Sequence, residues 1–284
     1  MSTKQIERLI QATPVTEGAG VTVHRTIGTP ALRHLDPFLL LDHFGTDDPD
    51  QYIAGFPDHP HRGFTTLTYM IDGHMLHEDS MGNKGDLKAG GIQWMKAASG
   101  VIHSEMPQQS EGLMRGFQLW INLPAEEKMS APDYQPFPAT AIPVTTADNA
   151  RIRVISGSYG DVTGPVSDPS TGVRYLDVTL SPGASFADEV PTGTTMFLYA
   201  FEGSGTIGGE EVPTHALAVM SPGGKFVISA ENELRFILVA GRPIAESIVQ
   251  YGPFVMNSRQ EIEQAFVDYN NGTLARTRAA WVND

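Results

Sequence analysis

The 284-residue sequence contains no cysteine, and this absence excludes several kinds of chemistry. Without thiols the chain forms no disulfide, thiolate metal site or iron–sulfur cluster, and it has no cysteine nucleophile. Basic residues are also scarce, because 19 lysines and arginines are set against 33 aspartates and glutamates, for a formal charge of −14. A broad nucleic-acid surface needs cations that replace phosphate counterions, so we expect no direct binding of DNA or RNA.

Long hydrophobic runs are missing as well. No stretch reaches the roughly 18 apolar residues that a membrane span requires. The first residues, MSTKQIERLIQATPV, are charged and lack the apolar segment of a signal peptide. We therefore expect a cytoplasmic protein that does not contact membranes.

Glycine and proline are plentiful, with 29 and 20 residues, which favours short strands joined by turns. A short helix is expected near the end, where Ser258 and Glu261 form a capping box and the NNG of residues 270–272 supplies a stop. Many strands at regular spacing predict an all-β sandwich or barrel. The runs rich in β-branched and aromatic residues are 21–27, 65–71, 92–95, 116–123, 151–157, 174–180, 195–201 and 234–241.

A proline-rich segment interrupts this pattern. Residues 124–143, PAEEKMSAPDYQPFPATAIP, contain five prolines and little periodicity, which is typical of a linker. We therefore predict an N-terminal domain over residues 1–131, a linker over 132–143 and a C-terminal domain over 144–284, with the helix at the end of the last.

The two predicted domains resemble one another in sequence. FTTLTYMIDG at 64–73 aligns with TTMFLYAFEG at 194–203, an offset of 130 residues. IQWMKAASGVIHSE at 92–105 aligns with LAVMSPGGKFVISA at 217–230, an offset of 125. This internal similarity predicts a duplicated β-domain.

Two short motifs in the N-terminal half suggest a metal centre. In a strand, residues i and i+2 point to the same face, so His59 and His61 form one pair, and His103 and Glu105 form another. A single HxH motif is often two exposed or structural histidines, but two such pairs in one β-domain favour a metal site. Three imidazoles and one carboxylate suit a divalent Fe, Mn, Ni, Cu or Zn ion, with two open positions in an octahedral geometry.

One such site per chain is expected. At the two offsets the duplicated half has no equivalent ligand set, which predicts that the C-terminal domain holds no metal. His77 is expected to be a hydrogen-bonded neighbour of the metal site rather than a ligand. The residues to which the four candidates map at these offsets are Glu189, Pro191, Ile228 and Ala230.

Several longer segments resemble the pirin family of the cupin superfamily, and the similarity extends over nearly the whole chain. The family's ligand positions fall on His59, His61, His103 and Glu105. Many relatives have Glu where this chain has Thr65; that Glu is not a family ligand, so the departure bears on the surroundings of the metal. The matching segments are DPFLLLDHF (36–44), GFPDHPHRGF (55–64), HEDSMGNKG (77–85), IQWMKAASGVIHSEMP (92–107) and YGPFVMNSRQEIEQAF (251–266).

The resemblance implies two cupin-type (double-stranded β-helix) barrels arranged face to face, with a short C-terminal helix. It also implies one metal, Fe(II) above Zn, Mn, Ni or Cu, and the activity of a quercetin 2,3-dioxygenase (flavonol 2,4-dioxygenase). Such an oxidoreductase opens a flavonol with O₂ and releases carbon monoxide, and Glu105 would be the base that accepts the proton of the 3-hydroxyl. The alternative is a non-catalytic, redox-sensitive iron-binding protein that binds protein partners as a transcription co-regulator.

Overall fold

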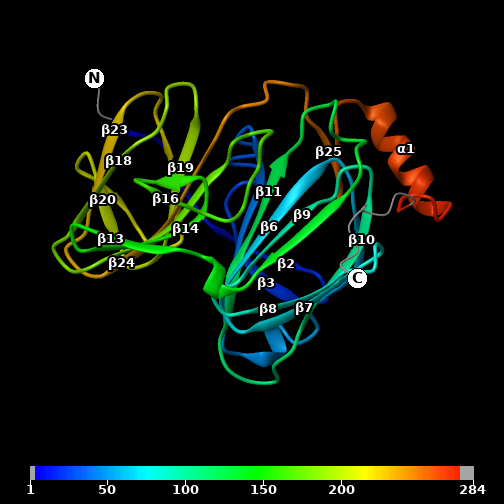
Figure 1. The fold of residues 1–284 in the computed structure, drawn as a ribbon, viewed down its shortest axis with the longest axis horizontal. Coiled ribbons are helices and arrows are strands. Elements are labelled where there is room, and N and C mark those ends of the chain that lie inside the picture. The colour runs from blue at the N-terminus through cyan, green and yellow to red at the C-terminus, as the bar shows by residue number, and fades with distance from the viewer. Residues whose placement is uncertain (1–3, 276–284) are drawn as a thin grey trace. The chain divides into compact units, whose positions relative to one another are not determined.

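The computed structural model describes residues 4–275 and divides them into two compact units, each built from three stretches of chain. Unit 1 comprises residues 4–13, 26–37 and 140–243, and unit 2 comprises residues 14–25, 38–139 and 244–275. Both consist mainly of antiparallel β-sheet (Figure 1), which confirms the all-β prediction. Within the described residues, no helix has the length and apolar character needed to cross a bilayer.

Unit 2 contains a seven-stranded sheet and a four-stranded sheet. The larger has the order β12-β9-β6-β11-β4-β3-β2, and the smaller has the order β5-β10-β7-β8. The larger sheet's strands are β2 (Thr13–Glu17), β3 (Val21–Arg25), β4 (Phe38–Thr46), β6 (Phe64–Asp72), β9 (Ile92–Lys96), β11 (Met114–Asn122) and β12 (Asp133–Phe137). Those of the smaller are β5 (Phe56–His61), β7 (His74–Asp79), β8 (Lys84–Lys88) and β10 (Val101–Pro107).

Unit 1 repeats this plan. Its seven-stranded sheet has the order β1-β22-β19-β24-β17-β14-β13, and its four-stranded sheet has the order β18-β23-β20-β21. The larger sheet's strands are β1 (Ile6–Gln11), β13 (Val144–Ala147), β14 (Ala150–Ser156), β17 (Arg174–Leu180), β19 (Thr195–Glu202), β22 (Ala216–Met220) and β24 (Leu234–Gly241). The others are β15 (Ser158–Tyr159), β16 (Val162–Thr163), β18 (Ser185–Glu189), β20 (Gly205–Ile207), β21 (Glu210–Val212) and β23 (Lys225–Ser229).

The two orders correspond strand by strand, as the internal sequence similarity predicts. In the larger sheets, β6 and β19 occupy the same place, as do β9 and β22, β11 and β24, and β4 and β17. In the smaller sheets, β5 corresponds to β18 and β10 to β23. A residue of one unit can therefore be assigned an equivalent in the other from strand register instead of a constant offset.

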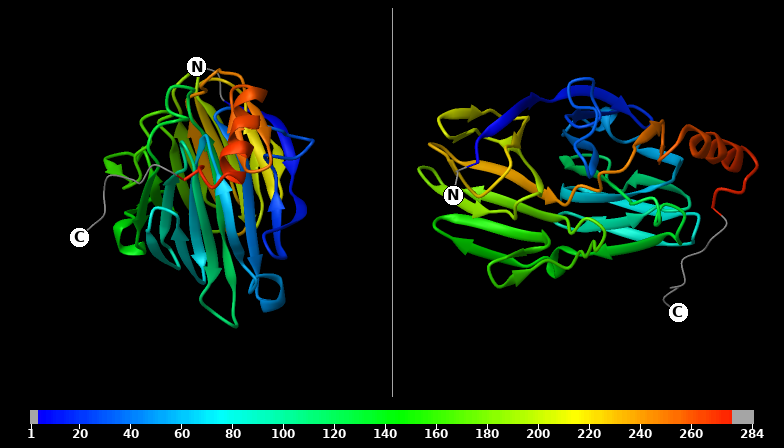
Figure 2. Two further views of the ribbon diagram at one scale, coloured as in Figure 1. Left: turned by 90° about the vertical axis from the view of Figure 1, so that its right-hand side faces the viewer. Right: turned by 90° about the horizontal axis from the view of Figure 1, so that it is seen from above.

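The compact units differ from the continuous domains expected over residues 1–131 and 144–284, because the ends of the chain are exchanged. Strand β1 pairs with β22 of unit 1, and Figure 2 shows the dark-blue N-terminal strand beside the yellow strands of that unit. The last segment, residues 244–275, belongs to unit 2. An edge strand pairs through its backbone, so its place in the sheet need not follow its place in the sequence.

The proline-rich segment also differs from the expected linker over residues 132–143. Strand β12 lies within it and pairs with β9, so that Pro136 is opposite Gln93. A proline donates no ladder hydrogen bond, which an edge strand tolerates on its outer side. The edge strand at this place lies outside the segments that align between the two halves. It is β12, beside β9, in unit 2 and β1, beside β22, in unit 1.

The C-terminal helix α1 (Arg259–Asn270) is confirmed at the predicted place. Ser258 is its N-cap and accepts a hydrogen bond from the Glu261 N–H, while the Glu261 carboxylate accepts from the backbone N–H of Asn257. Gly272 lies just beyond the end with a φ of +67°. The helix packs beside the hairpin of β25 (Val249–Tyr251) and β26 (Phe254–Met256), as Figure 1 shows.

Candidate metal centre

The HxH and HxE motifs lie on two adjacent strands, β5 and β10. Strand β5 is an edge strand, as the proline between the histidines predicts, and His59 is directly opposite His103. The ring centres of His59 and His103 are 4.3 Å apart, and those of His61 and His103 are 5.0 Å apart. Ligand nitrogens of these three histidines all lie within 4.8 Å of one another, close enough to hold one metal ion. Pro60 keeps the backbone of His59 extended and stiffens the pair.

Hydrogen bonds orient these imidazoles. Nδ1 of His59 is 2.8 Å from the carbonyl oxygen of Pro57, so it donates and leaves Nε2 as the free lone pair. Nδ1 of His103 lies 3.4 Å from Nδ1 of His77, whose Nε2 is 3.2 Å from the carboxylate of Asp79. If His77 donates to Asp79, its Nδ1 accepts from His103, and Nε2 of His103 is then free to bind a metal.

The environment of the buried histidines fits a metal. Nδ1 of His61 and Nε2 of His103 are buried and have no hydrogen-bond partner, an arrangement that is costly unless something binds there. Burial, together with the neighbouring imidazoles, holds the pKa of both rings well below the ordinary value, so both are neutral. Neutral imidazoles with free lone pairs are good ligands for first-row divalent metals.

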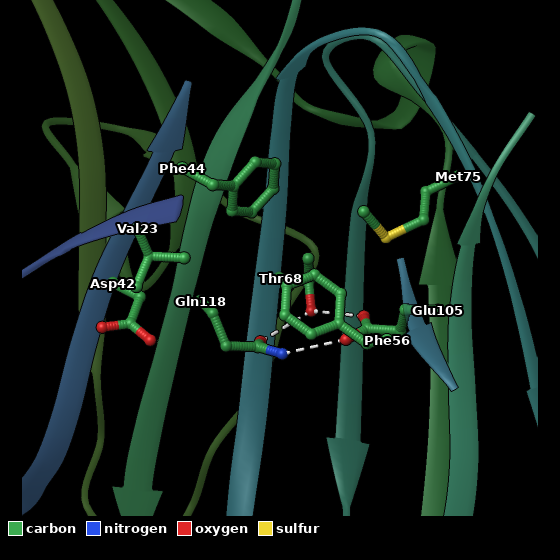
Figure 3. Close-up of a pocket in the computed structure, with 8 residues that line it drawn as sticks. All are labelled: Val23, Asp42, Phe44, Phe56, Thr68, Met75, Glu105 and Gln118. Atoms are coloured by element: carbon green, nitrogen blue, oxygen red, sulfur yellow. Dashed lines mark hydrogen bonds between the residues drawn. The ribbon is translucent and has the colours of Figure 1, made fainter. Parts of the chain in front are cut away.

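Glu105 lies in a hydrogen-bond network with three polar side chains. Its Oε1 accepts a short hydrogen bond from Nε2 of Gln93, and its Oε2 accepts one of 3.1 Å from Nε2 of Gln118. The single hydroxyl proton of Thr68 has two acceptors, Gln118 at 2.8 Å and Glu105 at 3.2 Å, and the shorter contact favours Gln118. Figure 3 shows the part of this network formed by Thr68, Gln118 and Glu105. Each carboxylate oxygen thus has an amide donor, which fixes the plane of Glu105.

Sequence reasoning missed these three residues, although a signal was present. Thr68, Gln93 and Gln118 each occupy a buried or half-buried position in a strand whose neighbours are mainly apolar. The conflict between a polar side chain and an inward position is itself the signal, because such groups need partners inside the protein. Only strand register shows that the partners are one another, since Thr68 is directly opposite both Gln118 and Gln93.

His77 lies closer to the candidate ligands than the sequence suggested. It is directly opposite Glu105 on β7, is 1% exposed and stacks on Tyr134 with ring centres 4.3 Å apart. His77, His103 and Glu105 form a second group whose ligand atoms lie within 4.8 Å of one another. Burial alone would raise the pKa of Asp79, but hydrogen bonds from His77 and Asn83 hold that pKa below its ordinary value. An ionised Asp79 keeps His77 hydrogen-bonded, which favours an orienting role.

The C-terminal segment packs against the strand that carries the HxH motif. His61 hydrogen-bonds the backbone of Pro253, and Val255 N–H donates to the carbonyl of Arg62 at 3.0 Å. Arg62 also forms an ion pair of 2.7 Å with Asp268 of α1. The buried ammonium of Lys128 donates to three acceptors, the carbonyls of Gly63 and Val255 and the side-chain oxygen of Asn122. The immediate surroundings of His61 are therefore completed by residues almost 200 positions away.

A pocket adjoins the candidate metal centre on the side of Glu105. The space within it is about 320 Å³ and includes space that is open to solvent. Its polar residues, Asp42, Gln118, Thr68 and Glu105, lie in one row, and most of its apolar residues lie to one side of that row (Figure 3). The lining residues are Val23, Asp42, Phe44, Phe56, Thr68, Met75, Glu105 and Gln118.

The equivalent place in unit 1 has no ligand set, but its residues differ from those given by constant offsets. Ile228 is opposite Phe186, and Phe226 is opposite Asp188, so register makes Phe186 and Asp188 the equivalents of His59 and His61. The earlier choices, Glu189 and Pro191, are therefore wrong by three residues. Loops between the strands differ in length, so no single offset holds across the repeat.

Comparison with known proteins gives consistent matches over the whole chain. The family model described as Pirin matches residues 20–121, and that described as Pirin C-terminal cupin domain matches residues 175–275. A Pseudomonas aeruginosa protein, named as a candidate quercetin 2,3-dioxygenase, is 50% identical over 92% of this chain and 95% of its own length. Human pirin is 40% identical over 98% of this chain and 96% of its own length.

A solved structure agrees with the fold. The crystal structure of quercetin 2,3-dioxygenase from Acinetobacter baumannii superposes with a TM-score of 0.90 at 33% identity, covering 96% of this chain and 99% of that one. The prediction of two cupin domains is thereby confirmed.

Proposed function

Since the chain belongs to the pirin family, we propose that it is a metal-dependent dioxygenase that opens flavonols such as quercetin with O₂ and releases carbon monoxide. One divalent metal, Fe(II) in our proposal, would be held by His59, His61, His103 and Glu105. The observation that carries the proposal is a pair of buried imidazole nitrogens without partners, next to a carboxylate that opens onto a pocket. The names of the Pseudomonas and Acinetobacter relatives support the same reaction class.

The pocket suits a planar aromatic substrate. Phe44, Phe56 and Met75 supply apolar walls, while Glu105 and Gln118 supply polar groups at one side. Apolar walls exclude water and strengthen the electrostatic interactions of the groups inside. A flavonol presents a hydroxyl and a carbonyl on adjacent carbons, and this edge would be turned toward Glu105 and the histidines.

Glu105 would accept the proton of the flavonol 3-hydroxyl. A metal bound at this site supplies a Lewis acid that lowers the pKa of the phenol. A carboxylate that serves both as a ligand and as the base would have to be free to accept a proton when substrate arrives. The amides of Gln93 and Gln118 would keep the carboxylate of Glu105 in place, because each donates to a different oxygen. The protonated Glu105 would then donate to the hydroxyl oxygen of Thr68, which lies 3.2 Å from Oε1.

The decisive experiment measures metal and turnover on one preparation. Protein purified without an affinity tag is analysed for its metal content and then loaded with Fe(II). Oxygen uptake, loss of quercetin absorbance and carbon monoxide release are followed together. We expect about one metal per chain and equal consumption of O₂ and quercetin. An iron-loaded protein without turnover would refute the enzyme and leave the alternative, an iron-binding protein that acts through protein partners; Zn, Mn, Ni and Cu loading serve as comparisons.

A further inference from the structure

A continuous row of polar residues crosses the seven-stranded sheet of unit 2. The row begins on β3 with Arg25, which is directly opposite Asp42, and Asp42 is directly opposite Gln118. It continues through Thr68 to Gln93. Directly opposite residues lie about 4.5–5.5 Å apart, so each member is within side-chain reach of the next. Gln118 and Gln93 donate to Glu105, Thr68 donates to Gln118, and the other two members form an ion pair.

The same row in unit 1 is apolar. Register makes Val154 and Leu176 the equivalents of Arg25 and Asp42, and the row continues through Leu238, Leu198 and Ala218. All five belong to the hydrophobic core of unit 1. The scaffold therefore folds without this polar row, and the row in unit 2 needs an explanation other than the fold.

The ion pair at the end of the row is largely buried, with the Arg25 and Asp42 side chains 15% and 8% exposed. The Asp42 residue as a whole is 6% exposed, and its two oxygens accept from Nε and Nη2 of Arg25 at 2.7 and 2.6 Å. A second carboxylate, that of Glu17, also pairs with Arg25. Buried ion pairs are often no more stabilising than apolar residues of similar volume, so stability is a weak reason for this one.

Asp42 also lines the pocket beside the candidate metal centre. A carboxylate has about four acceptor positions, and Arg25 occupies two, which leaves the others available to a ligand. Figure 3 shows Asp42 and Glu105 separated by Gln118 and Thr68, in agreement with their strand order. The pocket thus has an acceptor remote from Glu105, and Val23, Phe44 and other apolar residues also line it.

We propose that Asp42, held in place by Arg25, accepts a hydrogen bond from a phenolic hydroxyl at the end of the substrate remote from the metal. This deepens the proposed function and rests on it. The substrate class is then a flavonol that is hydroxylated on its pendant ring, and the Asp42–Arg25 pair determines specificity. A site built around a hydrogen bond rejects an analogue that lacks the donor, because its buried acceptor is left unpaired.

The test compares quercetin, which has pendant-ring hydroxyls, with galangin, which lacks them. Dissociation constants are measured by absorbance titration without oxygen, and kcat/KM is measured with oxygen. A hydrogen bond to a charged acceptor predicts that the wild type prefers quercetin by about 10–100-fold in both quantities. This comparison needs no variant. Equal affinity of the wild type for the two flavonols would overturn the proposal.

The variant Arg25→Val/Asp42→Leu installs the pair found in unit 1. It should keep its metal content but lose the preference for quercetin over galangin. The matched control is Arg115→Val/Asp72→Leu, which removes another cross-strand ion pair of the same sheet that does not line this pocket. The control should keep the preference. The single variant Asp42→Asn retains the shape and should reduce the preference in part.

The outcomes separate the two proposals. Quercetin turnover with equal galangin turnover, or an Arg25→Val/Asp42→Leu variant that still prefers quercetin, contradicts only the role of Asp42. Metal-loaded protein that neither binds nor cleaves any flavonol contradicts the proposed function, and the role of Asp42 fails with it.

Discussion

The two units have the same strand order, but equivalent inward positions carry polar side chains in unit 2 and apolar side chains in unit 1. In unit 2 the inward positions of β5 and β10 carry imidazoles and a carboxylate, and polar side chains cross the sheet beside them. In unit 1 the equivalent of His59 is Phe186, which packs against Phe236 with ring centres 5.9 Å apart. The equivalent of His103 is Ile228, which is fully buried. The comparison teaches that the duplicated scaffold provides the same inward strand positions in both units. The identity of a few side chains at these positions determines whether they form a hydrophobic core or a candidate metal centre.

The largest expected effect comes from replacing His103, and separately its equivalent Ile228, with alanine. His103→Ala should reduce metal affinity by more than the about 100-fold typical of a residue that only contacts a ligand. Ile228→Ala should leave metal binding unchanged but lower the free energy of unfolding by about 2–5 kcal/mol. Chelator competition and denaturant titration measure the two. Loss of metal in Ile228→Ala would contradict the assignment of the metal centre to unit 2 alone.

Glu105→Gln should affect turnover more than metal content. An amide cannot accept hydrogen bonds from both Gln93 and Gln118, and it is not a base. We expect flavonol cleavage per bound iron to fall by about 10²–10⁴-fold, with a modest loss of iron. The matched control is Glu78→Gln on the neighbouring strand β7, where the carboxylate is 45% exposed and pairs with Lys84. Near wild-type turnover per iron in Glu105→Gln would contradict the base role.

The ion pair of the polar row can be compared with its apolar equivalent in unit 1 by measuring the free energy of unfolding of variants. Asp42→Leu alone leaves Arg25 buried with only Glu17 as a partner, and breaking such a pair costs up to about 3–5 kcal/mol. Arg25→Val/Asp42→Leu, which copies unit 1, should be close to the wild type in denaturant titration. If the double variant is as unstable as the single one, the apolar pair of unit 1 cannot replace the ion pair of unit 2, and the prediction is wrong.

Lys128 predicts a pH dependence. Burial lowers its pKa from 10.5 to about 8, so in this range the unfolded chain binds a proton that the folded chain lacks. The contribution of Lys128 to stability should therefore rise with pH between about 8 and 10.5, by at most about 3 kcal/mol, and be constant below pH 8. Lys128→Met should remove this slope. Identical slopes for wild type and Lys128→Met in denaturant titrations across this range would contradict the prediction.

The smallest effect should come from His77. His77→Phe keeps the stacking on Tyr134 but removes the acceptor for His103, so metal affinity should fall about 10–100-fold. His74→Phe on the same strand is the control, because His74 is partly exposed and pairs with Asp86. If His77→Phe loses metal as completely as His103→Ala, His77 is a ligand and the preferred interpretation is wrong.

Patterns among residues close in sequence were sufficient to predict part of this structure. The period of two in strands placed His59 with His61 and His103 with Glu105, and the capping box placed α1. These features depend on residues close in sequence. Asp42 and Gln118, by contrast, are neighbours only through strand register, which the sequence does not show.

Strand β12 and the exchange of the chain ends could not be predicted for a related reason. Strand β12 pairs through its backbone, contains Pro136 and lies among other prolines, so its composition is that of a linker. The helix was expected with the C-terminal domain because the sequence there is continuous. Which sheet an end segment joins depends on contacts over 100 residues or more, and no local pattern encodes these.

The exchange of the chain ends has a consequence for synthesis. All four candidate ligands leave the ribosome about 150 residues before Pro253, which hydrogen-bonds His61. At about 5–20 residues per second, this interval lasts roughly 7–30 s. During that time the strand with the HxH motif lacks its C-terminal contacts, while the complete unit 1 sequence is made. The hydrogen bond between His61 and Pro253, and the packing of Val255 against Arg62, can therefore form only after almost the whole chain has been made.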